Sequence, residues 1–208
     1  EEKGEGRRQI IDFARQVRSF HGVVLSAKGA SARWLRSFLE DFEEVASAGE
    51  ADIEIEIAEG VSRELPTGAL LFATDRFRAH RSEKGISLTN GRSWVTVEPG
   101  PSIRGEVASD ESDPELEILF VALLIALREL RVFELHAAAV CRDDTALLLV
   151  GPSGSGKSST ALSLLTAGCD CLGDDRLLFR DRDGEIELLH YPVAFRATPE
   201  TLASFPAL

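Results

Sequence analysis

Residues 151–158 read Gly-Pro-Ser-Gly-Ser-Gly-Lys-Ser, a complete Gly-x-x-x-x-Gly-Lys-Ser motif. Glycines let the backbone curl so that successive N–H groups point inward, where a larger side chain would clash with a phosphate. The first turn of a following helix adds further N–H donors and about half a positive charge. The motif predicts a nucleotide-binding loop. Its binding residues are Gly151, Pro152, Ser153, Gly154, Ser155, Gly156, Lys157, Ser158 and Ser159.

Two side chains of this loop carry chemistry of their own. Lys157 can bridge the β- and γ-phosphates, and the Ser158 hydroxyl can join the shell of a Mg²⁺ ion, which keeps several waters beside few protein ligands. The apolar run 146–150 predicts a buried strand before the loop, and apolar residues recur at helical spacing from Ala161 to Leu165 behind it. An ordinary Gly/Ser-rich turn before a helix is the alternative interpretation.

Two adjacent acids, Asp174 and Asp175, end the predicted strand 169–173 that follows the loop helix. In an α/β sheet the ligand lies at the carboxyl ends of the strands, so these carboxylates are expected beside the phosphates. One acid can hold Mg²⁺, and the other can accept a proton from an incoming hydroxyl. Alternatively, one acid holds the metal and the other is solvated.

His136 lies on the predicted strand 134–142, just before the strand that leads into the loop. A single His on an apolar strand is usually a hydrogen-bonded core residue. The small side chains of residues 137–139 leave room beside the nucleotide site, where an imidazole could hydrogen-bond to an aspartate and tune it. The candidate catalytic residues are therefore His136, Lys157, Asp174 and Asp175.

This set of residues resembles the catalytic core of the HPr kinase/phosphorylases. The resemblance rests on His136-Ala-Ala-Ala-Val140, the loop 151–158, Gly168 and Gly173-Asp174-Asp175, with the family's spacing from His to Lys and from Lys to the Asp pair. It covers about residues 136–180. Ordinary P-loop proteins lack both the upstream His and the Asp pair at this distance. The phosphoenolpyruvate carboxykinases share the same distant fold.

The resemblance implies an α/β fold, with a P-loop kinase core of the HPr kinase/phosphoenolpyruvate carboxykinase type. Such enzymes use ATP and Mg²⁺ to phosphorylate a serine hydroxyl on a small carrier protein. By this resemblance Asp175 is the proton acceptor, Asp174 is the companion acid that holds the metal with Ser158, and His136 and Lys157 belong to the active site. The resemblance also indicates a homo-oligomer.

This chain departs from the family at three points. Ser159 stands where the family usually has Glu, and the family's Glu-Ile-Arg-Gly segment is not found, so its metal-binding role is not assigned to Glu200. The family's later Arg-bearing loop would lie beyond Leu208, so the core is expected to be incomplete at its C-terminus. These departures favour a serine or threonine kinase whose protein or peptide substrate is not HPr.

Two other functions remain open, a nucleotide-binding regulator or NTPase switch and a small-molecule kinase. Asp181 to Gly184 fits the Asp-x-x-Gly of G proteins, but it is better interpreted as a hairpin turn, and no Asn-Lys-x-Asp follows. Transporter ATPases are disfavoured because the chain has no Leu-Ser-Gly-Gly-Gln signature.

Composition limits the partners. The chain has 208 residues and a net charge of −12, which argues against a broad nucleic-acid or anionic-membrane surface. The longest apolar run, 118–127, is too short to span a bilayer, and no signal peptide opens the chain. Since the sequence begins at Glu1 and contains no Met, it is expected to be part of a longer product.

The three cysteines are expected on or beside strands as reduced thiols, which predicts a cytoplasmic protein. They are Cys141, Cys169 and Cys171. The Cys169-x-Cys171 pair could ligate a metal, but no second Cys or His pair completes a site, so packing in the core is the favoured role.

Residues 1–110 are predicted to form a small α+β domain with an antiparallel sheet and no catalytic constellation. Helices are expected at 10–20 and 32–48. Asn90-Gly91 predicts a tight hairpin. The expected strands are 22–25, 52–57, 69–72, 77–81, 86–89 and 93–98.

Residues 111–208 are predicted to form the kinase core. A cap at Asp113 and a proline at 114 predict the start of a buried helix that continues through 116–133. A further helix start is expected at 198–200. Besides the strands already named, strands are expected at 145–150, 177–180 and 185–189.

Overall fold

The computed structural model describes residues 16–29, 38–40, 42–45, 49–60, 66–108, 113–191, 201 and 203–205, without the side chains of 113–116. The chain divides into two compact units, Glu1–Ala126 and Leu127–Leu208, called here the first and second units. The sequence-based boundary at 110–111 lies earlier. Helix α2 (Asp113–Glu129) begins where the cap predicts and continues through the division.

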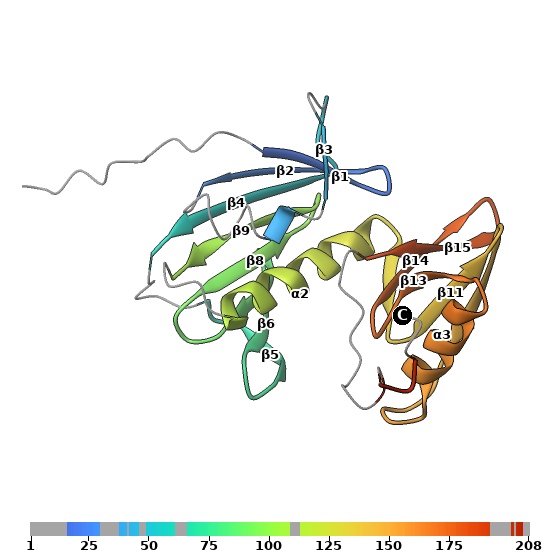
Figure 1. Cartoon of the computed structure of the whole chain (residues 1–208). Coiled ribbons are helices and arrows are strands. Elements are labelled where there is room, and N and C mark those ends of the chain that lie inside the picture. The colour runs from blue at the N-terminus through green and yellow to red at the C-terminus, as the bar shows by residue number, and fades with distance from the viewer. Residues whose placement is uncertain are drawn as a thin grey trace, which may run out of the picture. The chain divides into compact units, whose positions relative to one another are not determined.

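The first unit is built on one nine-stranded sheet (Figure 1). Its strand order is β3-β1-β2-β4-β9-β8-β7-β6-β5. The β2–β4 and β4–β9 pairs are parallel and all other neighbours are antiparallel. The strands are β1 (Gln16–Phe20), β2 (Val23–Gly29), β3 (Glu43–Glu44), β4 (Ile53–Glu59), β5 (Ala69–Ala73), β6 (Arg78–Ser82), β7 (Gly85–Thr89), β8 (Trp94–Glu98) and β9 (Ser102–Val107).

Alternation along β4 shows why this sheet forms. Ile53, Ile55 and Ile57 are 0–1% exposed, whereas the glutamates between them are exposed. Successive strand residues point to opposite faces, so one face of β4 is apolar and buried and the other is acidic and solvated. Helix α2 lies against the sheet in Figure 1, and Arg76 before β6 forms an ion pair with Glu117 of the helix (Nη1–Oε2 3.1 Å).

The helix predicted at 10–20 is wrong in its described part, and the helix predicted at 32–48 is confirmed at residues 38–39 and wrong at 43–44. Residues 16–20 form strand β1, which pairs with β2 through the His21-Gly22 turn, and residues 43–44 form strand β3. Residues 10–15 and 32–37 lie outside the described residues. Apolar residues three or four apart fit a helix face, but pairing with β2 overrides that local preference.

The second unit contains two three-stranded sheets. One has the order β10-β14-β15 and the other β12-β11-β13, and every pair in them is antiparallel. Helix α3 (Lys157–Thr166) connects β12 to β13. The strands are β10 (Val132–Leu135), β11 (Ala138–Arg142), β12 (Thr145–Leu149), β13 (Asp170–Gly173), β14 (Leu177–Arg182) and β15 (Glu185–His190).

The predicted fold class, an α/β P-loop kinase core after a small antiparallel α+β domain, is wrong. The described residues are mostly strand, with fifteen strands beside the helices α2 and α3 and helical residues at 38–39, 201 and 203, and the nine-stranded sheet is mixed. Parallel neighbours need crossovers of a dozen or more residues. Here tight turns join β11 to β12 and β14 to β15, and positive φ at both Asp183 and Gly184 matches a hairpin turn that enforces antiparallel pairing.

Candidate functional site

Three distant segments meet at the amino end of strand β11. Leu149, the last residue of β12, pairs with Ala138, and Gly173, the last residue of β13, pairs with Ala139. Since β12 and β13 are both antiparallel to β11, their carboxyl ends lie at the same end of this sheet, on either side of β11. The Gly-rich loop 151–158, the turn with Asp174 and Asp175, and His136, which precedes β11, therefore all lie at this end of the sheet.

The loop between β12 and α3 depends on its glycines in two ways. Gly154 and Gly156 have φ of 77° and 87°, and a Cβ added at either would meet no atom within 4 Å. Backbone conformation rather than space therefore requires glycine at both. At Gly151 an added Cβ would lie 2.7 Å from the Ser155 hydroxyl. Gly156 caps α3 without a side-chain hydrogen bond, so no cap side chain occupies the first-turn N–H groups.

Lys157 is held by the loop that precedes it. Its side chain is only 9% exposed, and Nζ donates to the carbonyl oxygens of Gly151 (2.9 Å) and Pro152 (3.2 Å). The ammonium group therefore lies against the backbone of the loop rather than in bulk solvent. A positive charge at this place suits a phosphate chain that the loop would enclose.

Ser158 and Asp174 come together although they lie on different elements. The Ser158 hydroxyl at the start of α3 donates to Oδ1 of Asp174 after β13, at 3.0 Å, and Asp174 is 9% exposed. These are the two residues expected to hold Mg²⁺. A hydroxyl and a carboxylate are hard oxygen ligands, so the pair fits this ion.

His136 contacts the backbone of Asp175, not its carboxylate. Its Nδ1 donates to the Asp175 carbonyl oxygen at 2.9 Å, and both side chains are exposed. Asp175 has φ of 68°, a left-handed conformation that Asp tolerates better than most residues. The hydrogen bond therefore fixes the turn from which the Asp175 side chain departs.

The other predicted loop residues are exposed and contribute mainly backbone. Ser155 N–H donates to the Pro152 carbonyl oxygen (3.2 Å), which closes a turn. The carbonyl oxygen of Ser159 accepts from the Ser163 hydroxyl one turn along α3 (3.0 Å). Ser153 is exposed at the tip of the loop.

Arg176 and Glu134 were not predicted at this site. Arg176 Nε lies 3.9 Å from Glu134 Oε1, and the Arg176 N–H donates to the Asp174 carbonyl oxygen (2.9 Å). Only their positions in the sequence could have indicated them, because Glu134 precedes His136 by two residues and Arg176 directly follows the acid pair. A Cβ at Gly173 would lie 2.9 Å from the Arg176 carbonyl oxygen, so this turn is tight.

Cys141 lies on β11 and Cys171 on β13, and Cys169 directly precedes β13. Cys169 packs against a cluster of Ala138, Val140 and Ala161, which fits the packing role predicted for the cysteine pair, whereas Cys171 is exposed and does not fit it. Partial burial raises the pKa of the Cys171 thiol, and the charge of Asp174 raises it further. Among the described residues no group of three or more His, Cys, Asp and Glu side chains could hold a metal.

No protein-family model, curated protein or solved structure matches the chain. The likeness to the HPr kinase/phosphorylases therefore rests on the residues quoted between 136 and 180. None of the helices in the described part of the chain is long and apolar enough to cross a membrane.

Proposed function

We propose that this site binds ATP with Mg²⁺ and transfers the γ-phosphate to a Ser or Thr hydroxyl of a protein or peptide. The observation that supports the proposal most is the 3.0 Å hydrogen bond between Ser158 and Asp174. In nucleotide-hydrolysing proteins that have this loop, its Ser or Thr and an Asp from a neighbouring strand hold Mg²⁺ beside the phosphates. The proposal rests on this local geometry and not on the overall fold.

The residues present suit magnesium because that ion takes few protein ligands. Mg²⁺ is commonly bound by one or two carboxylates together with phosphate oxygens and water. Ser158 and Asp174 would hold it, at the start of α3 and after β13. When bound, Mg²⁺ would neutralise charge on the transferred phosphoryl group.

Lys157 and the loop backbone would bind the phosphate chain. The ammonium group, which now donates to the carbonyls of Gly151 and Pro152, would exchange them for phosphate oxygens. Charge-assisted hydrogen bonds to an anion are stronger than those to neutral carbonyls, so this exchange favours nucleotide binding. Positive φ at Gly154 and Gly156 turns the loop so that its N–H groups can add to this contact.

Asp175 would accept the proton of the attacking hydroxyl, and His136 would act as a positioning residue. Because His136 donates to the Asp175 carbonyl oxygen, it holds the left-handed backbone of the turn. A general base must lie within hydrogen-bond reach of the proton that it takes, so a displaced turn would slow transfer. His136 would therefore affect the rate of transfer more than the binding of nucleotide.

The first experiment measures binding of ATP with Mg²⁺ to the whole chain by calorimetry. Lys157→Ala is expected to weaken binding at least about tenfold, which corresponds to about 1.4 kcal/mol. Lys28→Ala removes an exposed lysine of β2 that pairs with Glu56 and serves as the matched control. Equal binding by wild type and Lys157→Ala would rule out this loop as the phosphate site.

The second experiment follows transfer of label from γ-labelled ATP to a pool of Ser- and Thr-containing peptides. Asp175→Asn should reduce transfer by about 10²- to 10⁴-fold, the usual contribution of a general base, while ATP binding stays unchanged. Asp183→Asn is the control, since Asp183 also lies exposed in a left-handed turn. Transfer that survives in Asp175→Asn would remove this residue as the base.

The two other functions are outcomes of the same assay. Wild-type protein that binds ATP and releases phosphate only to water would be an NTPase switch. Label that appears on a small hydroxyl compound but on no peptide would indicate a small-molecule kinase. Either result would overturn the peptide acceptor and retain the phosphate site.

A further inference from the structure

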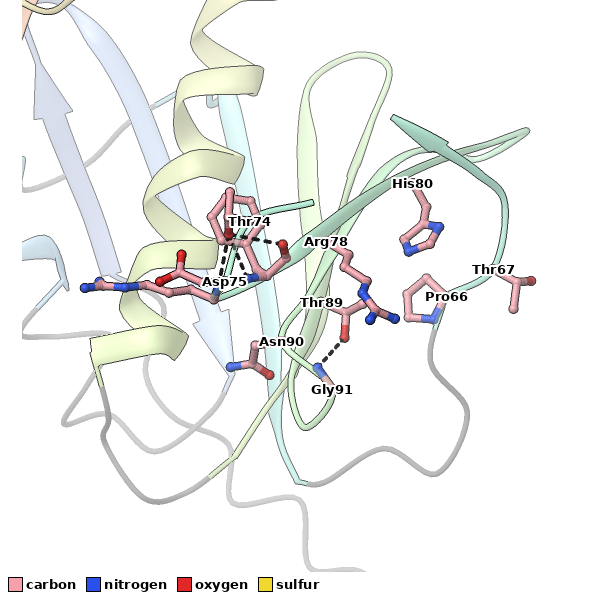
Figure 2. A pocket seen from close by; sticks show the side chains of 11 residues that line it. Pro66, Thr67, Thr74, Asp75, Arg78, His80, Thr89, Asn90 and Gly91 are labelled. Carbon is pink, nitrogen blue, oxygen red and sulfur yellow. Dashed lines mark hydrogen bonds between the residues drawn. The ribbon is translucent and has the colours of Figure 1, made fainter. Parts of the chain in front are cut away.

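A hollow of about 490 Å³ lies in the first unit, independent of the nucleotide site proposed above. It is bounded by the segment before β5, the turn between β5 and β6, strand β6 and the turn between β7 and β8 (Figure 2). Pockets that hold small molecules measure roughly 300–1,000 Å³, so this volume suits a metabolite better than a single ion.

Hydrogen bonds within the two turns fix the walls of this pocket. Thr74 Oγ1 accepts from the N–H groups of Arg76 (3.1 Å) and Phe77 (3.0 Å). In the other turn Asn90 Oδ1 accepts from the N–H of Ser93 (2.8 Å), and Gly91 N–H donates to Thr89 Oγ1 (3.1 Å). The walls are therefore formed before any ligand enters, which lowers the entropic cost of binding.

Arg78 and His80 give one end of the pocket a positive character. They alternate along β6 with Ala79, which is fully buried, so both project from the opposite face of the sheet. Figure 2 shows them at the end of the pocket that Pro66 and Thr67 line, while Asp75 lies at the other end. His80 Nδ1 faces the Gly68 carbonyl oxygen at 3.4 Å, which leaves Nε2 to face a ligand.

The guanidinium group of Arg78 has no hydrogen bond and no ion pair with any residue that the structure describes. The neighbouring Arg76, by contrast, is paired with Glu117. The chain has 35 acidic and 23 basic residues, so carboxylates are abundant on its surface. An arginine that no carboxylate of the described residues neutralises, in a preformed hollow, presents five N–H donors in a fork that matches an oxyanion.

We propose that this pocket binds a small organic oxyanion, with Arg78 as the main recognition residue and His80 as the second donor. Carboxylate and phosphate share the geometry that the guanidinium fork recognises, so the head group is defined as either of these. Phe77 and Pro66 line the pocket and would contact the carbon skeleton. Since the net charge of −12 repels anions in general, binding here must come from local contacts.

The test titrates the full chain with succinate and, separately, with inorganic phosphate, and follows the ring signals of His80 by NMR. Sodium chloride at equal ionic strength is the reference. One of the two probes should shift these signals saturably, with a dissociation constant at or below about 1 mM. The stronger probe identifies the head group as carboxylate or phosphate. No saturable shift with either probe would overturn the proposal.

Arg78→Gln should weaken binding of that probe at least about tenfold, equivalent to about 1.4 kcal/mol. Arg81→Gln, on the same strand but outside the pocket lining, is the matched control and should change binding less than about twofold. An equal loss in both variants would indicate general charge attraction and refute the site. Thermal unfolding of both variants should match wild type, since both side chains are exposed.

The loop at 151–158 is a second candidate phosphate site, so the phosphate titration is repeated with Lys157→Ala. The response of His80 should be the same as in the wild type. A response of His80 that disappears with Lys157→Ala would assign the effect to the nucleotide loop and would contradict a separate pocket. The outcome for the proposed kinase activity is independent of both titrations.

Discussion

The two units differ in what their interiors are made of. The large side chains that are less than 2% exposed lie mostly in the first unit, on β2, β4, β7, β9 and α2, and the second unit contributes Leu127 and Leu177 to them. In the second unit the fully buried residues of two core clusters are mostly alanines, among them Ala138 and Ala139, and partly buried leucines pack around them. Because hydrophobic stabilisation follows buried apolar area, the first unit should hold most of the stability, while small residues let backbones approach at the candidate site.

Removal of a large side chain from the first unit should produce the largest effect. Ile55→Ala on the central strand β4 should lower the free energy of unfolding by about 2–5 kcal/mol, because Ile55 is 1% exposed and truncation leaves a cavity. Both tryptophans of the chain, Trp34 and Trp94, lie in this unit, so their fluorescence during urea unfolding measures the effect.

Glu54→Ala on the same strand is the control, since Glu54 is exposed and should change stability by less than about 0.5 kcal/mol. The ATP binding that we propose for the second unit should not change in either variant. A loss of ATP binding in Ile55→Ala at temperatures where α3 stays folded would contradict the separation of stability and chemistry between the units.

A smaller loss of folding stability is expected at Gly105, where the backbones of β8 and β9 lie too close together for a side chain to fit. Gly105 of β9 lies beside β8, and a Cβ at this position would collide with the carbonyl oxygen of Trp94. Gly105→Ala should cost about 1–3 kcal/mol, the usual range for overpacking, in the same urea experiment. Gly60→Ala, where the nearest atom to an added Cβ is 3.7 Å away, is the control, and an equal cost would refute the steric explanation.

Gly156 in the second unit is required for its backbone conformation, unlike Gly105, which is required for lack of space. Gly156 has open space around an added Cβ but a φ of 87°, so Gly156→Ala should cost about 1–2 kcal/mol through backbone strain alone. Amide hydrogen exchange in α3 should become faster, and ATP binding should weaken, while the tryptophan transition of the first unit stays in place. Unchanged exchange in α3 would contradict the structure of the loop.

The smallest effect concerns the reactivity of a thiol beside the site. Burial raises the pKa of Cys171 above its ordinary value of 9.0, with further increases from Asp174 and Cys141 and an opposing hydrogen bond from the backbone of Gly173. Less thiolate is then present at pH 8, so iodoacetamide should modify Cys171 slowly, with a rate that still rises above pH 9. Asp174→Asn should speed the reaction, and mass spectrometry of the labelled peptides measures it.

Local patterns predicted elements well where one physical cause dominates. The strict alternation of residues 52–57 gave strand β4, the Asn90-Gly91 pair marked the β7–β8 turn, and the caps at Asp113 located the start of α2. The succession of strand, glycine loop and helix around residues 145–166 was also predictable. In each case the neighbours in sequence supply the contacts that decide the conformation.

Pairing between distant segments was not predictable from such patterns. The apolar run before the loop indicates a buried strand, yet β12 is an edge strand on which Leu147 is 50% exposed and Val150 after it is 67% exposed. Strand β9 was missed, because Gly105 interrupts its side-chain pattern and its place between β4 and β8 is a tertiary property. The direction of neighbouring strands, and with it the fold class, depends on the same long-range pairing.

The order β12-β11-β13 has a consequence for how this site could fail. The Gly-rich loop follows β12 and the two acids follow β13, and both strands pair with β11. The pairing of Ala138 with Leu149 and of Ala139 with Gly173 fixes the register of both strands against β11. An insertion or deletion of one residue in β11 would invert its two faces and offset the loop from the acids in one event. The relative placement of the loop and the acids thus depends on the five residues of β11, none of which has a role in the proposed chemistry.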